Sequence, residues 1–321
     1  MTILVAGGSG FVGSNALEFL LKKNIKIIAT YFKNKPFIKS NNITYIKADL
    51  SCFKTCLNLS RDIKYIYMFA GHVFSQASLV NNPNINIGKN ILVNLNMAKA
   101  AIENKVKYYC WLSSSTGYPN GSKTFVEQDF FKKDPPPNYF IPGWQSRFLE
   151  KIIYYYSKSS TSNTRIITIR PSEIFGKYDD FDYKTCHALP AYCRRIVEAQ
   201  DTRIDKKIMV TGNFLKKKNY ICASDLILII YKIMHMKQKK NYEVYNICSK
   251  FNYSLKELLE IIINIENNNR LSLVFEKNIK KEVNNFRNFS NKKIINKIFF
   301  NEKNNMKNNL IELLNWYKLN R

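Results

Sequence analysis

The sequence predicts an α/β protein built on a doubly wound parallel sheet, with a smaller C-terminal lobe. Three observations predict this fold. Short apolar segments alternate with segments of helical periodicity through the N-terminal half of the chain. A glycine-rich turn joins the first apolar segment to the first helical one. The chain of 321 residues is long enough for one such unit and a second lobe.

The expected strands are short apolar runs bounded by turns or helical segments. In chain order they span residues 2–6, 25–30, 43–50, 63–71, 108–115, 164–176 and 242–248. Helices are expected over residues 14–23, 91–105 and 143–158, and a loop over the proline-rich run 134–138, because proline lacks an amide hydrogen. Ser254, with Glu257 three residues later, forms a capping box that predicts a helix over 254–265.

The composition argues against several classes of protein. The net charge of +26 comes from lysines spread along the whole chain, so a solvated basic surface is favoured over a nucleic-acid-binding face. No apolar run is long enough to span a membrane, and "MTILVAGGSG" lacks the pattern of a signal peptide. The seven cysteines include no C-x-x-C pair. Free thiols in a reducing cytoplasm are therefore favoured over disulfides or a metal site, and we expect no nucleic-acid or membrane partner.

The stretch "VAGGSGFVG" places Gly7, Gly10 and Gly13 in a G-x-x-G-x-x-G pattern between the first strand and the first helix. The first glycine permits a tight turn, the second lets backbone amides approach a pyrophosphate, and the third lets helix and strand pack closely. The helix N-terminus then faces the anion. This context favours a dinucleotide site over a glycine-rich turn without a ligand.

We therefore expect a Rossmann-type dinucleotide-binding domain over residues 1–168 and a lobe over 169–321. Segments at about residues 221–248 are expected to return to the first domain.

The end of the second strand bears on the choice of cofactor. NAD-preferring enzymes commonly carry a carboxylate there, which binds the ribose hydroxyls. Here Tyr31 occupies the position, and Phe32, Lys33 and Lys35 follow. No carboxylate repels a 2′-phosphate and two lysines can pair with one, so the sequence favours NADP over NAD. Asp49 is expected to cap the next turn or to contact the adenine amino group.

These residues resemble the extended short-chain dehydrogenase/reductase superfamily, and within it the NAD(P)-dependent nucleotide-sugar epimerases and dehydratases. The matching segments fall in family order and include "GGSGFVG", "ADL", "FAG", "RPSEIFG" and "VYNICSKFNYSLKELLEIII". The resemblance covers nearly the whole chain. The stretch "GKYDDFDYKTCHALPA" is most similar to the GDP-L-fucose synthase branch, which reduces and epimerises a GDP-4-keto-6-deoxy sugar.

The resemblance implies a role for individual residues. Ser114 would hydrogen-bond the sugar oxygen, and Thr116 stands where the fucose-synthase branch has an acid/base cysteine. His187 matches that branch's second acid/base residue. Lys218 replaces an arginine near the nucleotide, and Arg287 matches a nucleotide-phosphate contact. The alternative is that the two hydroxyls are ordinary turn residues and the histidine an ordinary loop residue. The implied cofactor contacts are Gly7, Ser9, Gly10, Phe11, Val12, Gly13, Tyr31, Lys33, Asp49, Leu50, Ala70 and Gly71.

The Tyr-x-x-x-Lys pair of this family is missing. Its spacing puts both side chains on one helix face, where the lysine favours the tyrosinate and the tyrosine exchanges a proton with the sugar oxygen. The family typically has a glutamate four residues after the lysine, and Glu150 fixes that register. Pro142 and Ser146 therefore stand at the tyrosine and lysine positions.

The nearby substitutes are poor by sequence spacing. Tyr139 lies three residues too early, and Arg147 is about 100° around the helix from the lost lysine. Tyr154 and Lys158 repeat the spacing, but about 18 Å further along the helix.

Three functions remain open. The first is a nucleotide-sugar-modifying enzyme with an altered proton relay, in which His187 and Thr116 move protons and Ser114 orients the oxygen. The second is a catalytically inactive protein that binds cofactor or nucleotide sugar. The third, a basic nucleic-acid-binding protein, rests on charge alone. Loss of an acid/base group costs ~10²–10⁴ in rate, which is a large handicap without being zero activity.

A homodimer is also expected. Family members commonly pair the helices that correspond to residues 90–104 and 143–158 into a four-helix interface. Large apolar side chains cover too much of the second helix for a single core-facing stripe. The alternative is that the sheet and the C-terminal lobe cover them all. They are Phe148, Leu149, Ile152, Ile153, Tyr154, Tyr155 and Tyr156.

Overall fold

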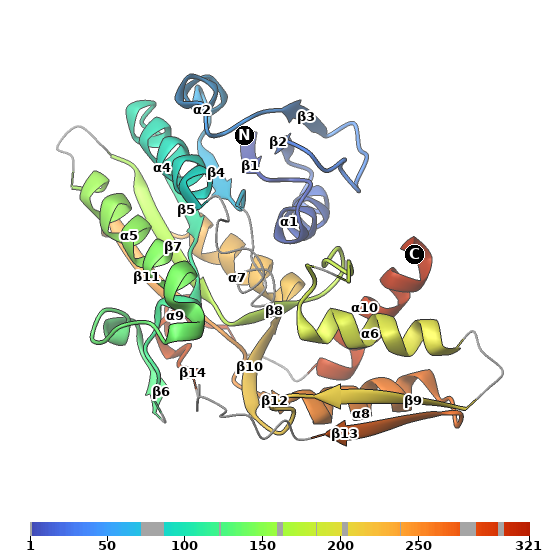
Figure 1. Cartoon of the computed structure of the whole chain (residues 1–321). Helices are drawn as coiled ribbons and strands as arrows, with labels where there is room; N and C mark the ends of the chain where they lie inside the picture. Colours follow the sequence, from blue (N-terminus) through green and yellow to red (C-terminus); the bar gives the residue numbers. More distant parts are fainter. Residues whose placement is uncertain are drawn as a thin grey trace.

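The structure is a computed structural model, and an α/β sheet with a smaller second lobe forms its frame (Figure 1). It describes residues 2–71, 87–121, 123–158, 163–183, 185–200, 205–237, 239–276, 287–300 and 305–321.

The large sheet has seven parallel strands in the order β11-β7-β5-β4-β1-β2-β3. The chain moves outward from β1 through β2 to β3 and then returns to β4 on the other side of β1. Ligands of open α/β sheets bind at the carboxyl ends of the strands beside such a reversal. The predicted doubly wound parallel sheet is thus confirmed. Its strands are β1 (Thr2–Ala6), β2 (Lys26–Tyr31), β3 (Ile43–Lys47), β4 (Tyr65–Met68), β5 (Tyr108–Leu112), β7 (Arg165–Pro171) and β11 (Tyr242–Ile247).

Helices cover both faces of this sheet, because alternate side chains of a buried strand point to opposite sides. One core joins Ile3 and Val5 of β1 to α1 (Phe11–Leu21), α7 (Ala223–His235) and α9 (Lys292–Ile298). The other core joins Leu4 and Ala6 to α2 (Phe53–Ser60), α4 (Ile87–Glu103) and α5 (Phe140–Tyr156).

The second lobe has its own core, formed where three helices pack on short strands. The predicted capping box of α8 is confirmed: Glu257 N donates to Ser254 Oγ at 3.1 Å, and Ser254 N donates to Glu257 Oε2 at 2.7 Å. The helices of the lobe are α6 (Ala188–Gln200), α8 (Leu255–Glu266) and α10 (Met306–Asn320). The strands are β8 (Glu173–Phe175), β10 (Lys217–Cys222) and β12 (Asn252–Ser254), with β9 (Lys206–Thr211) paired to β13 (Leu271–Glu276).

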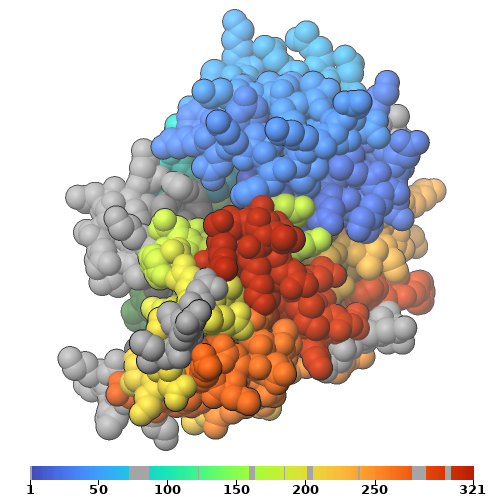
Figure 2. Space-filling view, turned by 90° about the vertical axis from the view of Figure 1, so that its right-hand side faces the viewer, coloured from blue at the N-terminus to red at the C-terminus, as the bar shows by residue number. Residues whose placement is uncertain are grey.

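Helix α10 lies at the junction between the two parts of the molecule, where it separates the N-terminal residues from α8 in the side view (Figure 2). Trp316 of α10 is in ring contact with Phe37, which follows β2, and with Tyr178, which follows β8. Phe37 and Tyr178 also contact each other, with ring centroids 5.6 Å apart. Aromatic packing therefore fixes the C-terminal helix against both parts.

Several predicted elements differ from the structure: α4 begins four residues earlier than predicted, and β3, β4 and β5 end earlier than predicted. Residues 164–176 form two strands, because the chain leaves the large sheet at Ser172 and β8 pairs with β10 instead. Helix α1 begins at Phe11, directly after the glycine turn, and α5 begins at Phe140, because the short helix η3 (Pro137–Tyr139) leads into it. Among the described residues, no helix has the length and apolarity needed to cross a membrane.

One side of α5 carries large apolar side chains that remain exposed. Ile141, Trp144 and Phe148 are each more than 40% exposed, and Tyr155 is 73% exposed. Their spacings of three, four and seven residues put them on one face of the helix. Leu92 of α4, which packs beside α5, is 50% exposed as well (Figure 1). Exposed apolar side chains gathered on one helix face are typical of an interaction site.

We expect this α4/α5 face to pair with the same face of a second copy, as an isologous dimer does. Light scattering at micromolar concentration should give a dimer of the 37.6 kDa chain. Phe148→Glu should give a monomer, because a carboxylate buried in the interface has no partner. Leu319→Glu, at an exposed position of α10, is the matched control and should leave the dimer intact. A monomeric wild type would refute the prediction.

Candidate active site

The glycine turn between β1 and α1 is shaped by contacts that exclude side chains. Gly7 has φ +87°, a conformation that L side chains rarely adopt, and its amide donates to Thr30 Oγ1 at 2.9 Å. A Cβ on Gly7 would lie 2.7 Å from the backbone of Ala70, and a Cβ on Gly13 would lie 2.0 Å from Gly7 O. The turn therefore rests directly on the end of β4, where the sheet order reverses.

This turn fits a pyrophosphate. Gly10 is the N-terminal cap of α1, has no side-chain capping hydrogen bond, and is followed by no acidic residue in the first turn. The amides of a first helical turn lack intrahelical acceptors, so they face outward together with the positive end of the helix dipole. A dinucleotide bound here would be held by the turn and the first residues of α1. Among the predicted cofactor contacts, Ser9 is buried in the turn, and Phe11 and Val12 are the first two residues of α1.

The ends of the neighbouring strands supply the other predicted cofactor contacts. The side chain of Asp49 accepts from Ser51 N at 2.9 Å and from Ser51 Oγ at 2.6 Å. Asp49 therefore caps the turn, which was the first of its two expected roles. Its other oxygen pairs with Lys89 of α4 at 3.1 Å. The hydrogen bonds from Ser51 lower the pKa of Asp49, and Lys89 lowers it further.

A cationic side chain that was not singled out in the sequence lies at this end of the site. Lys89 Nζ sits 4.7 Å from the ring centroid of Phe32, the residue after Tyr31. The exposed Lys33 is the next residue along the chain, and Tyr31 itself packs edge-on against Tyr45. Leu50 is buried, and a Cβ added to Gly71 would lie 3.3 Å from Asn90 Oδ1.

The predicted catalytic hydroxyls lie in one turn after β5. Ser114 caps the short helix η1 (Ser115–Gly117), accepting from Thr116 N at 3.2 Å and from Thr116 Oγ1 at 2.9 Å. The first turn of α5 presses on this turn, since a Cβ on Gly143 would lie 2.9 Å from Thr116 O. Ser114, Thr116 and the start of α5 therefore form one surface at the carboxyl end of the sheet.

The positions predicted for the tyrosine and lysine stand on α5 beside this surface. Ser146 Oγ donates to Pro142 O at 2.9 Å, within the helix. A proline and a serine supply neither a phenol nor a cation. Arg147 is buried, with Nε donating to Gly117 O at 2.9 Å and Nη2 donating to Lys133 O. It braces the loops around the turn and does not replace the lysine.

Behind the surface lies a buried ion pair. Glu150 of α5 and Arg170 of β7 are joined by two hydrogen bonds, Nη2 to Oε2 at 2.6 Å and Nε to Oε1 at 2.9 Å. Ser113, the residue before the predicted catalytic serine, donates to the same carboxylate at 2.6 Å. The glutamate that set the register of the missing pair thus has a structural role of its own.

The predicted residues of the second lobe gather around Glu173, which the sequence analysis did not single out. Lys218 of β10 pairs with Glu173 of β8 at 3.2 Å. The Lys218 ammonium holds the pKa of Glu173 below its usual range against burial, and His187 and Arg287 act in the same direction. His187 itself is exposed, and Arg287 donates to the carbonyl oxygens of Ser115 and Thr116, each at 3.4 Å. Arg287 therefore links this cluster to the serine turn.

The signal for Glu173 was present in the sequence as the lone carboxylate of "RPSEIFG". Single-sequence reasoning had no way to pair it with Lys218, because the β8–β10 pairing brings together residues 45 positions apart.

The loop between β8 and α6 leads to His187 and contains a buried carboxyl group. Asp179 accepts from Asp180 N at 2.8 Å, while its Oδ2 has no partner among the described residues. Burial raises the pKa of Asp179 from its ordinary value of 3.8 to about 8. The group is therefore largely protonated at neutral pH.

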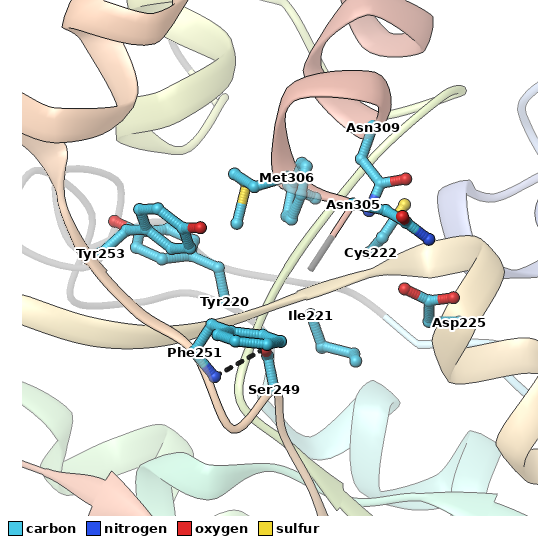
Figure 3. A pocket seen from close by; sticks show the side chains of 11 residues that line it. Tyr220, Ile221, Cys222, Asp225, Ser249, Phe251, Tyr253, Asn305, Met306 and Asn309 are labelled. Carbon is cyan, nitrogen blue, oxygen red and sulfur yellow. Dashed lines mark hydrogen bonds between the residues drawn. The ribbon is translucent and has the colours of Figure 1, made fainter. Parts of the chain in front are cut away.

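A separate hollow lies on the second lobe (Figure 3). Its wall includes Phe251, whose amide donates to Ser249 Oγ at 3.0 Å, and Asp225 at the start of α7. Tyr220 of β10 also lines it. None of the predicted site residues contributes to the wall, so the hollow is distinct from the surface at the serine turn.

The sequence and the fold both match known proteins. Residues 3–248 match the NAD dependent epimerase/dehydratase family. The chain is 23% identical over 266 residues to GDP-L-colitose synthase of Yersinia pseudotuberculosis, covering 83% of this chain and 82% of that protein.

Two solved structures share the fold. UDP-glucose 4-epimerase with UDP-glucose from Thermotoga maritima has a TM-score of 0.83 at 16% identity and covers 100% of this chain and 99% of that one. UDP-glucuronic acid 4-epimerase from Bacillus cereus, in complex with UDP-glucuronic acid and NAD, has a TM-score of 0.79 at 18% identity and covers 100% of both chains.

Two glycine substitutions should separate folding from cofactor binding. Gly13→Ala should destabilise the protein and abolish binding, because its Cβ would overlap Gly7 O. Gly10→Ala should unfold at nearly the wild-type temperature, since its Cβ would lie 3.4 Å from Gly7 O, but should weaken binding by crowding the pyrophosphate. Thermal unfolding and the fluorescence of bound NADPH measure both effects. Undiminished binding by Gly10→Ala would place the dinucleotide elsewhere.

Asp179 should make stability depend on pH. Its pKa is raised in the folded state, so folding binds a proton, and stability should fall as pH rises from about 4 to about 8. The expected slope from this group is at most about 1.4 kcal/mol per pH unit. In urea unfolding, Asp179→Asn should remove that dependence of stability on pH. The control Asp205→Asn, at an exposed position, should leave it unchanged. An unchanged slope in Asp179→Asn would contradict the assignment.

Proposed function

Because the chain belongs to the NAD dependent epimerase/dehydratase family, we propose that it modifies a nucleotide sugar with an altered proton relay. The proposed substrate is an NDP-4-keto sugar, and a GDP sugar is favoured. Several of the relatives that match the sequence are named for GDP sugars, among them GDP-L-colitose synthase, GDP-mannose 3,5-epimerase and a putative GDP-L-fucose synthase. The class of reaction is epimerisation, reduction or dehydration at the sugar.

One observation carries the proposal: Arg287 joins the serine turn to the charged cluster of the second lobe. In the proposed mechanism Ser114 orients the sugar oxygen, while Thr116 and His187 move protons. Lys218 and Arg287 bind the nucleotide phosphates, which suits the excess of positive charge on the chain. Proton abstraction beside an existing ketone proceeds without the missing tyrosine.

The cofactor in this proposal is NADP in preference to NAD. Tyr31 stands where a ribose-binding carboxylate would repel a 2′-phosphate, and Lys33 lies two residues on. Lys89 adds a cation over the ring of Phe32, at the same end of the sheet. The nicotinamide would supply hydride, and the residues of this chain would position it. A cytoplasmic location accords with the seven free thiols, which all lie in described residues.

The second candidate function is binding without turnover. Pro142 and Ser146 hydrogen-bond to each other through the helix, and neither supplies a phenol or a cation. In this alternative the cofactor turn and the phosphate cluster hold their ligands while a partner protein performs the chemistry.

Turnover on keto sugars decides between the two. Purified protein with a GDP-4-keto-6-deoxy sugar and NADPH should incorporate solvent deuterium into the sugar or consume NADPH. His187→Gln should lower the rate by about 10²-fold or more, as loss of an acid/base group does. If a panel of keto sugars gives no turnover, and Pro142→Tyr with Ser146→Lys restores it, the wild type is a binding protein.

A further inference from the structure

A phenol lies beside the serine turn, although α5 has proline at the predicted tyrosine position. Tyr139 ends η3 and is the N-terminal cap of α5. The guanidinium of Arg287 lies over its ring, with Cζ 4.1 Å from the ring centroid. The same guanidinium donates to the carbonyl oxygens of Ser115 and Thr116. One side chain therefore joins Tyr139 to the turn that carries Ser114.

Sequence spacing along α5 argued against Tyr139 as a substitute for the missing tyrosine. The backbone conformation of Tyr139 removes that objection. Its φ of −121° and ψ of 17° are not helical, so the geometry that relates positions on one helix face does not apply to it. The residues that follow it bring α5 against the serine turn, as the close approach of Gly143 to Thr116 O shows. Tyr139 thus enters the site from the cap of the helix and not from its side.

Arg287, from the segment before β14 (Asn288–Phe289), is the side chain in contact with the ring of Tyr139. Lys218 and Tyr220 of β10 interact with Tyr139 electrostatically. Glu173 raises the pKa of Lys218 most strongly, and Tyr139 adds to that effect. Burial lowers the pKa of Arg287, and Tyr139 opposes that change. The contact between Arg287 and the ring of Tyr139 therefore lies between the serine turn and the charged cluster around Glu173.

We propose that Tyr139, whose ring Arg287 holds beside the serine turn, is the acid/base group that replaces the missing tyrosine. The inference rests on the proposed function. In reduction, a hydride from the reduced nicotinamide adds to the carbonyl carbon of the sugar. The O–H bond of Tyr139 breaks, its proton goes to the carbonyl oxygen to form the hydroxyl, and Tyr139 is left as the phenolate. In oxidation the proton returns to Tyr139 as the hydride leaves.

The test is Tyr139→Phe, which keeps the ring over Arg287 and removes only the hydroxyl. Its matched control is Tyr155→Phe on the same helix, where the side chain is 73% exposed on the outer face. With a keto sugar that the wild type reduces, Tyr139→Phe should lower kcat by ~10²–10⁴-fold. The dissociation constant of the nucleotide sugar, measured by calorimetry, and the melting temperature should not change. The pH–rate profile should lose the limb due to the acid, and Tyr155→Phe should resemble the wild type throughout.

Two results overturn the inference. One is an unchanged kcat in Tyr139→Phe. The other is weaker substrate binding at constant kcat, which would mean that the hydroxyl only helps to hold the sugar. Failure of the proposed function is seen separately, before any variant is made: a wild type that binds nucleotide sugars and turns none over removes both proposals together.

Discussion

The site depends on one buried interaction, the ion pair between Glu150 and Arg170. A single guanidinium is shared among several elements: it binds the carboxylate of α5 twice, donates to Tyr118 Oη at 3.0 Å and donates to Glu127 O at 2.9 Å. Tyr118 in turn donates to Asn246 Oδ1 of β11 at 2.6 Å. The middle of α5, the end of the serine turn and the edge of the sheet are thereby held in one arrangement. Removing one partner of a buried pair costs about 3–5 kcal/mol, because the other charge stays buried.

That interaction explains how a site can lose its relay and keep its shape. The Tyr-x-x-x-Lys pair acts on substrate and cofactor, whereas Glu150 acts on the scaffold. Pro142 lies in the first turn of α5, where an amide hydrogen is dispensable, and Ser146 satisfies its hydroxyl within the helix. Both replacements are therefore tolerated by folding, and the surface around Ser114 remains in place for other groups to use.

Sequence reasoning succeeded where the determinant is local. The parallel sheet, the glycine turn and the capping box at Ser254 each follow from a short pattern with a steric or hydrogen-bonding cause, and the structure confirms them. It failed where the determinant is a pairing between distant residues. Glu173 meets Lys218 only through β8 and β10, and Lys89 meets Asp49 only when α4 crosses the ends of the strands.

The order of the strands has a consequence for synthesis on the ribosome. Strand β7 ends at Pro171, and its outer neighbour β11 begins only at Tyr242, after the first strands and helices of the second lobe have been made. Synthesis proceeds at ~5–20 residues per second, so β11 follows β7 after on the order of ten seconds. During that time the hydrogen-bonding edge of β7 has no partner strand. An open edge recruits other strands, so this interval is when nascent chains are most exposed to misassembly. The last strand of the sheet acts as a closing step that translation itself delays.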